Sequence, residues 1–197
     1  MKLKTILLEM ASDTFQMYHG GQRWSRIPSE LIGASKGRYE GGVGIYFTND
    51  YNTARHYAKG ARVVHLVNIS KEFKTLDEIE IPVNEMVTFV KSVAGMKKKK
   101  EVIQDLLANA QRRSKDTISL DILNNLVVNY EIGAGRVGVD ISNFFVSKGA
   151  DANVEMQGGG EYWVIVFNPK IIKSVSIVDP KTVDSNFSFL LPKPPKA

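Results

Sequence analysis

The stretch Gly44-Ile45-Tyr46-Phe47-Thr48 runs from a glycine into a short apolar segment and ends on a polar residue. Asp50 and Asn52 follow it, and both residue types are favoured before a helix because their side-chain oxygens accept free backbone N–H groups. The sequence predicts a strand here and then a helix over 52–59, with Gly60 as its stop. The N-terminal part of the fold is therefore expected to contain a strand followed directly by a helix.

Further strands are expected on both sides of this passage. Before it, glycines and aromatic residues surround Tyr18-His19-Gly20-Gly21, a pattern typical of strands and loops. After it, residues 62–69 place alternate side chains inward and predict a strand. The last third predicts strands over 153–156, 162–167 and 171–178. The first two of these flank Gly158-Gly159-Gly160, which is typical of a flexible loop.

The middle of the chain, 77–130, contains little glycine and has apolar residues at helical spacing. The expected buried faces are Val102, Leu106, Leu107 and Ala110, and then Leu120, Leu123, Val127 and Tyr130. Ser119 is a suitable cap for the second helix, and Asp140 for a further short helix that stops at Gly149. Strand-rich ends around a helical middle predict the α+β class rather than a regular alternation of strand and helix.

We expect a single domain over residues 1–190, with a helical insertion at about 77–135. A chain of 197 residues is long enough to bury one sizeable core. Residues 191–197 are rich in proline and lysine and are expected to form an extended tail, because proline lacks the N–H that helices and sheets require.

Composition narrows the possible chemistry. The chain has no cysteine, which excludes disulfides, thiolate metal sites and cysteine nucleophiles. Its three histidines, His19, His56 and His65, are too few for a dedicated zinc site, so we expect no metal. Glu9 and Asp13 interrupt the N-terminal apolar residues, and no apolar run has the length of a membrane span. We therefore expect a cytoplasmic protein, in the producing cell or in a target cell.

The formal net charge is +5, and much of the excess lies in Lys97–Lys100, Arg112-Arg113 and Lys193–Lys196. This charge is compatible with NAD, a nucleic acid or an acidic protein surface as a partner. We interpret the run 97–100 as the solvent-exposed start of a helix, with a docking patch for an acidic partner as the alternative.

Several residues are suited to binding and cleaving NAD, whose nicotinamide–ribose bond breaks through a sugar cation. Tyr46 and Tyr57 offer two rings that can sandwich nicotinamide. Gly20 lets a backbone N–H and C=O approach the carboxamide, because no side chain blocks them. Glu161 offers a negative charge for the developing cation, and His19 an anchor for a ribose.

The same segments resemble the His-Tyr-Glu branch of the ADP-ribosyltransferases, which includes diphtheria-type toxins and the poly(ADP-ribose) polymerases. His19-Gly20 is similar to the first motif of that family. Gly44-Ile45-Tyr46-Phe47 followed by Tyr57 is similar to the second, and Glu161-Tyr162 before an apolar strand to the third. The motifs occur in the family's order between Tyr18 and Phe167, with a helical stretch between the second and the third.

The resemblance implies a split β-sheet core and a role for each residue. His19 would contact a ribose hydroxyl, Gly20 would hold the carboxamide, Tyr46 and Tyr57 would enclose the nicotinamide ring, and Glu161 would be the catalytic carboxylate. His19 and Tyr46 complete the catalytic set with Glu161. Glu155 is the reserve candidate for the carboxylate.

Two features of the sequence qualify the resemblance. The polymerases commonly have serine where Ala54 stands, so one hydrogen bond to the carboxamide is either absent or supplied by Thr53. No Glu-x-Glu or Gln-x-Glu pair accompanies the third motif, which makes the arginine-modifying clostridial branch a poorer match. Asn49-Asp50 and Arg23-Trp24 are also of interest, and the residues expected to meet the pyrophosphate of NAD are Arg23, Arg26 or Lys36.

The function that the resemblance implies is mono-ADP-ribosylation: one ADP-ribose unit moves from NAD to a macromolecular acceptor, with release of nicotinamide. A protein acceptor is favoured, and a nucleic acid is the alternative. The compactness of the chain is similar to that of stand-alone toxins and effectors of bacteria and phages. An NAD glycohydrolase on the same fold and a non-catalytic nucleic-acid-binding module are the alternatives. The acceptor stays open, because its choice depends on loops that follow no sequence code.

Overall fold

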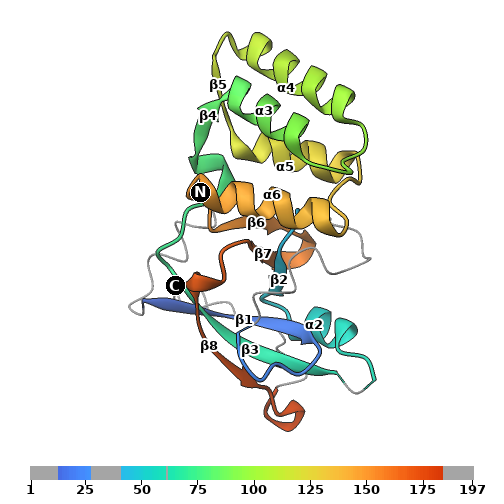
Figure 1. Ribbon diagram of the computed structural model, residues 1–197. Coiled ribbons are helices and arrows are strands. Elements are labelled where there is room, and N and C mark those ends of the chain that lie inside the picture. The colour runs from blue at the N-terminus through green and yellow to red at the C-terminus, as the bar shows by residue number, and fades with distance from the viewer. Residues whose placement is uncertain (1–12, 28–40, 61, 184–197) are drawn as a thin grey trace.

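The computed structural model describes residues 13–27, 41–60 and 62–183 (Figure 1). The expectations for Lys36 and for the tail 191–197 lie outside the described residues. The α+β class predicted from the sequence is confirmed, since helices accompany a sheet whose strand pairs are antiparallel.

A six-stranded sheet with the order β6-β7-β2-β1-β3-β8 forms the base of the fold. Its strands are β1 Thr14–Gly21, β2 Ile45–Thr48, β3 Val63–Ser70, β6 Ala152–Met156, β7 Tyr162–Val166 and β8 Ile172–Ile177. The strands expected over 62–69, 153–156, 162–167 and 171–178 are present within one or two residues of these bounds, and β1 contains the segment Tyr18–Gly21. The expected loop between β6 and β7 contains a single 3-10 turn, Gly158–Gly160.

The sheet consists of two halves joined at one point. Strand β1 pairs with β3 along its whole length, from Thr14↔Ser70 to Gly21↔Val63, but it pairs with β2 only at Tyr18↔Thr48. One half is therefore β6-β7-β2 and the other is β1-β3-β8. In Figure 1 the first half lies in the centre of the molecule and the second below it.

Helix α2 (Tyr51–Tyr57) follows β2 directly. Asp50 is its N-cap, and the Asp50 carboxylate accepts a hydrogen bond from the Asn52 N–H, as the sequence predicts. The helix ends at Tyr57 with Ala58 as its C-cap, two residues before the predicted end at position 59. It packs on β1 and β3 through a small cluster of buried side chains, namely Tyr18, Tyr51, Ala54 and Val64.

A helical unit lies between β3 and β6 in the chain. It contains α3 (Val83–Ser92), α4 (Lys99–Arg113), α5 (Leu120–Asn129), α6 (Arg136–Ser147) and a two-stranded sheet of β4 (Glu80–Pro82) and β5 (Thr117–Ser119). Further 3-10 turns occur at Leu76–Glu78, Pro169–Ile171 and Pro180–Thr182. None of the described helices is long and apolar enough to cross a membrane.

Three details of the helices in this unit differ from the sequence prediction. Helix α6 begins at Arg136, so Asp140 is not its cap but lies one turn inside it, 3.0 Å from the Arg136 guanidinium. Ser119 precedes α5 as predicted, yet its hydroxyl contacts the Asp121 carboxylate instead of a backbone N–H. Leu107 is 45% exposed, because the buried stripe of α4 is narrower than predicted and consists of Val102, Leu106 and Ala110.

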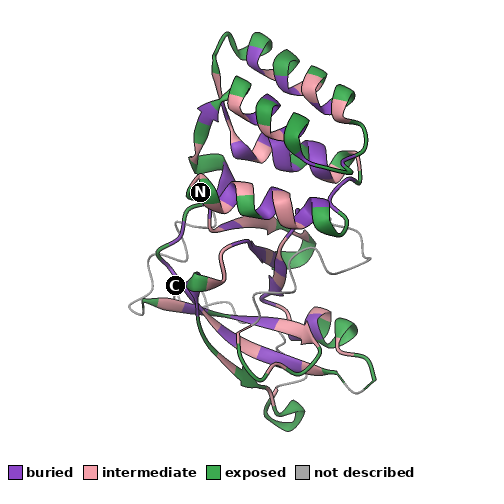
Figure 2. Ribbon diagram, in the orientation of Figure 1, coloured by how far each residue is buried: buried purple, intermediate pink, exposed green. Residues whose placement is uncertain are grey.

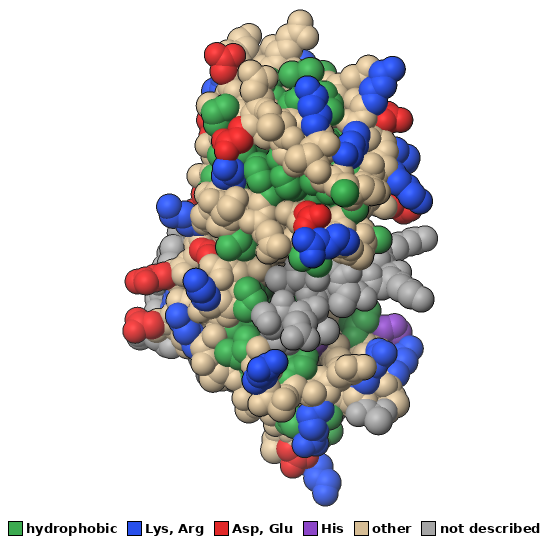
Figure 3. Space-filling model, in the orientation of Figure 1, with side chains coloured by type: hydrophobic (Ala, Val, Ile, Leu, Met, Phe, Trp, Pro, Cys, Tyr) green, Lys and Arg blue, Asp and Glu red, His purple; other side chains and the backbone are tan. Residues whose placement is uncertain are grey.

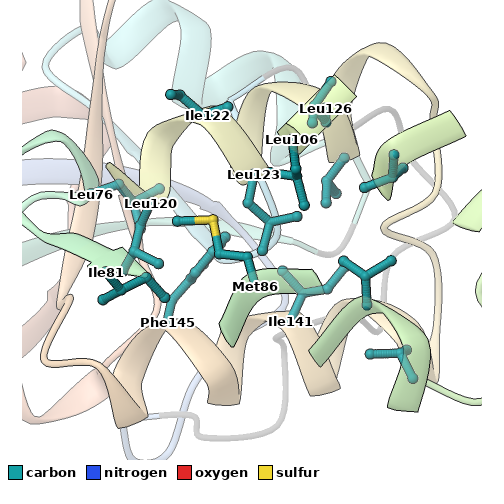
Figure 4. Packing of buried hydrophobic residues seen from close by; sticks show 14 of the residues in the cluster. Leu76, Ile81, Met86, Leu106, Leu120, Ile122, Leu123, Leu126, Ile141 and Phe145 are labelled. Carbon is teal, nitrogen blue, oxygen red and sulfur yellow. The ribbon is translucent and has the colours of Figure 1, made fainter. Parts of the chain in front are cut away.

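The two faces of the sheet are covered by different apolar clusters. Buried residues occur both in the helical unit and along the strands of the sheet (Figure 2). Neighbouring residues of β7 show the alternation, because Ile165 packs with the helical unit whereas Val164 packs with Met17 and Phe47 on the other face. Within the helical unit, Met86, Leu106, Leu123 and others converge (Figure 4). Since side chains two residues apart share a face, Glu161 and Trp163 project on the same side as Ile165.

Gly20 is required by the close approach of β1 and α2. A Cβ at this position would overlap the carbonyl oxygen of Ala54, which belongs to the backbone and cannot rotate away. We expect Gly20→Ala to lower the free energy of unfolding by about 1–3 kcal/mol, since α2 must shift. Urea unfolding followed by circular dichroism measures this change. Gly158→Ala is the matched control, because a Cβ there meets no heavy atom within 4 Å. An equal loss in both variants would contradict this packing.

Candidate functional site

The junction between the two half-sheets brings the first and second sequence motifs together. The His19 imidazole reaches from β1 to β2, where its Nδ1 lies 2.8 Å from the carbonyl oxygen of Tyr46. The contact lies immediately beside the one registered pair of β1 and β2, Tyr18↔Thr48. A side chain therefore closes the gap that opens where the backbone pairing of these strands stops.

The His19 contact determines which imidazole nitrogen carries a proton. A carbonyl oxygen only accepts hydrogen bonds, so Nδ1 must donate. Burial lowers the pKa of His19 to about 4, although the bond to Tyr46 acts in the opposite direction, so the ring is neutral at pH 7. The other nitrogen, Nε2, is then an acceptor. It lies beside Gly21, where a Cβ would come within 2.7 Å of it. The first motif thus presents an acceptor for a hydroxyl group.

The Trp24 ring packs against the His19 imidazole. The Trp24 ring stacks on His19 with centroids 4.4 Å apart, and on His65 with centroids 4.6 Å apart. The backbone N–H of Trp24 donates to Nε2 of His65, a fully buried residue whose pKa is lowered by burial. His65 was not predicted as a site residue, and the only signal for it is its register with His19 on the adjacent strand. Arg23, beside Trp24, is exposed.

Glu161 directly precedes β7 and accepts hydrogen bonds from three side chains. Thr48 Oγ1 and Trp163 Nε1 each lie 2.7 Å from Oε1, and Thr53 Oγ1 lies 3.1 Å from Oε2. The Thr48 hydroxyl in turn accepts from the backbone N–H of Asp50 at 3.0 Å, which leaves its own proton for Glu161. The donors come from β2, α2 and β7, so the carboxylate is held from three elements.

Asn49 fixes the backbone on both sides of Glu161. Its side chain is fully buried, donates to the carbonyl of Gly160 at 3.1 Å and accepts from the N–H of Tyr162 at 2.9 Å. The residue before Glu161 and the residue after it are therefore both tied to the end of β2. The sequence singled out Asn49-Asp50, but neither this contact nor those of Thr48 and Trp163 could be predicted from it.

The two predicted ring residues have different surroundings. Tyr46 is half-buried; its hydroxyl donates to the carbonyl of Gly42 at 2.6 Å and accepts from the N–H of Gly41 at 3.1 Å. Its ring meets the Trp163 ring edge to face, with centroids 5.9 Å apart. Tyr57, at the end of α2, is 55% exposed, and its ring contact is with His56. Tyr46 is thus part of the junction, whereas Tyr57 is an exposed residue at the end of α2.

Glu155, the reserve candidate, is half-buried on the edge strand β6, opposite Trp163 in the register. Burial raises the pKa of its carboxyl group, and Asn153 donates to it at 2.7 Å, which acts against that rise. Its surroundings thus differ from those of Glu161, whose three donors converge at the junction. Within the described ranges, no group of three or more acidic or histidine side chains is arranged to hold a metal ion.

The depressed pKa of His19 makes stability depend on pH. The unfolded chain takes up this proton near pH 6.5, whereas the folded protein takes it up only near pH 4. The contribution of neutral His19 to the free energy of unfolding is therefore present above pH 6.5. It is lost as the pH falls towards 4, and the loss is about 1–3 kcal/mol. Urea unfolding at several pH values measures it. His19→Asn keeps a donor for the Tyr46 carbonyl but does not titrate, so its stability should fall less over this range. Equal pH dependence in both proteins would contradict a buried neutral His19.

Comparison of this chain with family models, with curated proteins and with solved structures finds no match. Its function is therefore inferred from the side chains gathered at the junction and from the motifs that contain them.

Proposed function

We propose that this chain is a mono-ADP-ribosyltransferase of the His-Tyr-Glu type, which transfers ADP-ribose from NAD to a macromolecular acceptor. The observation that carries the proposal is that His19 and Glu161 are both fixed to β2, the strand that contains Tyr46. His19 bonds the Tyr46 carbonyl and Glu161 bonds the Thr48 hydroxyl. The three motif residues that resemble the catalytic set of this family thus meet on one four-residue strand.

In the proposed reaction, the bond between the nicotinamide nitrogen and C1′ of the ribose breaks, and its electron pair leaves with nicotinamide. Positive charge then develops on the ribose. The Glu161 carboxylate stabilises this charge, and because Thr48, Thr53 and Trp163 already hold it, little reorganisation accompanies the reaction. A nucleophilic atom of the acceptor forms the new bond to C1′ and gives up its proton to solvent.

The other residues of the proposed site bind and orient NAD. Nε2 of the neutral His19 accepts a hydrogen bond from a ribose hydroxyl. Gly20 gives backbone access for the carboxamide, although the same glycine is also required for packing against Ala54. Tyr46 stacks on nicotinamide with an orientation fixed by its hydroxyl contacts. Because the Thr53 hydroxyl lies on Glu161, we assign Thr53 to holding that carboxylate rather than to replacing the family's serine.

The charge visible on one face of the molecule gives no specific support to a nucleic-acid-binding module. On the face seen in Figure 3, Lys and Arg side chains are spread over the helical unit and the sheet, with Asp and Glu among them. A protein that binds nucleic acid by charge usually gathers its basic side chains on one face or stripe. Hydrolysis of NAD would use the residues described above with water as the acceptor, so the products distinguish it from transfer.

Glu161→Gln tests the proposed reaction. The amide keeps an oxygen that can accept from Thr48 and Trp163 but has no negative charge, so we expect nicotinamide release to fall by at least about 100-fold. Nicotinamide is measured by chromatography after incubation with NAD and a cell lysate as the source of acceptor. Circular dichroism checks that the variant is folded.

Glu155→Gln is the matched control, a second half-buried glutamate on the adjacent strand, and it should release nicotinamide at the wild-type rate. Loss of activity in Glu155→Gln with full activity in Glu161→Gln would reverse the assignment of the carboxylate. Label from NAD recovered on protein supports transfer, whereas free ADP-ribose alone indicates hydrolysis. A wild-type protein that releases no nicotinamide when it is incubated with NAD and the cell lysate would contradict the proposed function.

A further inference from the structure

We propose that Trp163 is a positioning residue that fixes one oxygen of Glu161, Oε1, and leaves the other, Oε2, to act on the substrate. The kinetic part of this inference rests on the proposed function. The geometry behind it does not, since it concerns contacts within the protein alone.

The two oxygens of Glu161 have different surroundings. Oε1 accepts two short hydrogen bonds of 2.7 Å, one from the Trp163 indole and one from the Thr48 hydroxyl. Oε2 accepts one longer bond of 3.1 Å, from Thr53. Thr53 has a single hydroxyl proton, and its Oγ1 also lies 3.3 Å from an oxygen of the Asp50 carboxylate. The Thr53 proton can therefore turn to Asp50 when Oε2 receives a hydrogen bond from a substrate. Oε2 is thus the oxygen that can accept a further hydrogen bond.

The indole of Trp163 is a rigid support for this arrangement. Its ring contacts the half-buried Tyr46 ring edge to face, and the Tyr46 hydroxyl is bonded to the backbone of Gly41 and Gly42. The Gly41 carbonyl also accepts from the buried Asn124 of α5. A continuous series of contacts thus runs from the helical unit through Tyr46 and Trp163 to Glu161. A tryptophan has only two side-chain torsions, so little freedom remains in the direction of its N–H.

The chain provides an internal comparison for the hydrogen bond itself. Of its two tryptophans, Trp163 donates its indole N–H to a carboxylate, whereas the buried Trp24 Nε1 has no hydrogen-bond partner among the described residues. In a proton–nitrogen correlation spectrum of the ¹⁵N-labelled full chain, we expect the Trp163 indole proton downfield of that of Trp24. Trp24→Phe assigns the two signals. Glu161→Gln should move the Trp163 signal upfield and leave that of Trp24 in place.

Trp163→Phe tests the kinetic consequence. Phenylalanine keeps an aromatic ring against Tyr46 but removes the N–H, so Glu161 should lose its orientation. We expect kcat for nicotinamide release to fall by about 10- to 100-fold while KM for NAD changes little, because the interaction acts on the transition state. Val154→Ala controls for a general loss of packing, since Val154 lies on β6 and packs with the cluster on the opposite face. It should keep the wild-type kcat.

A Trp163→Phe variant with wild-type kcat would overturn the proposal, as would a Trp163 signal that does not respond to Glu161→Gln. The two measurements also separate this inference from the function on which it rests. If the wild-type chain turns over no NAD, the proposed function is wrong, and the spectrum alone then decides whether Trp163 holds Glu161.

Discussion

The structure depends on a limited contact, the junction at which β1 and β2 share one registered pair, Tyr18↔Thr48. Beyond this pair the two strands are joined by the His19 imidazole, which donates to the Tyr46 carbonyl. Within each half-sheet the strands are paired by backbone hydrogen bonds along their length. At the junction this pairing stops, and side chains from both halves form hydrogen bonds instead.

Strand β2 links the two halves to the proposed site. It has four residues, yet it supplies the carbonyl that holds His19, the hydroxyl that holds Glu161 and the ring that meets Trp163. Asn49, directly after it, fixes the backbone on either side of Glu161. The carboxylate is thus oriented by the protein before any substrate binds, which is the condition under which a fixed charge stabilises a developing cation most effectively.

Local patterns in the sequence predicted much of this architecture. The alternation in β3 and the cap of α2 depend on neighbouring residues, so both could be recognised without the fold. The early start of α6 was missed because Gly135, with a positive φ, precedes it in place of a capping side chain. The pairing of β4 with β5 was also missed, since α3 and α4 separate these short strands in the chain.

By itself, the sequence determined the α+β class, the strand positions and the identity of His19, Tyr46 and Glu161 as candidates, because residue type, spacing and order along the chain suffice for these. Only the tertiary structure decided what those residues touch. Thr48 and Glu161 are 113 positions apart, and no local pattern connects a threonine at the end of one strand with a glutamate directly before another. Their contact, like that of Glu161 with Trp163, arises from strand pairing and from the face on which each side chain projects, and both are fixed only when the sheet forms.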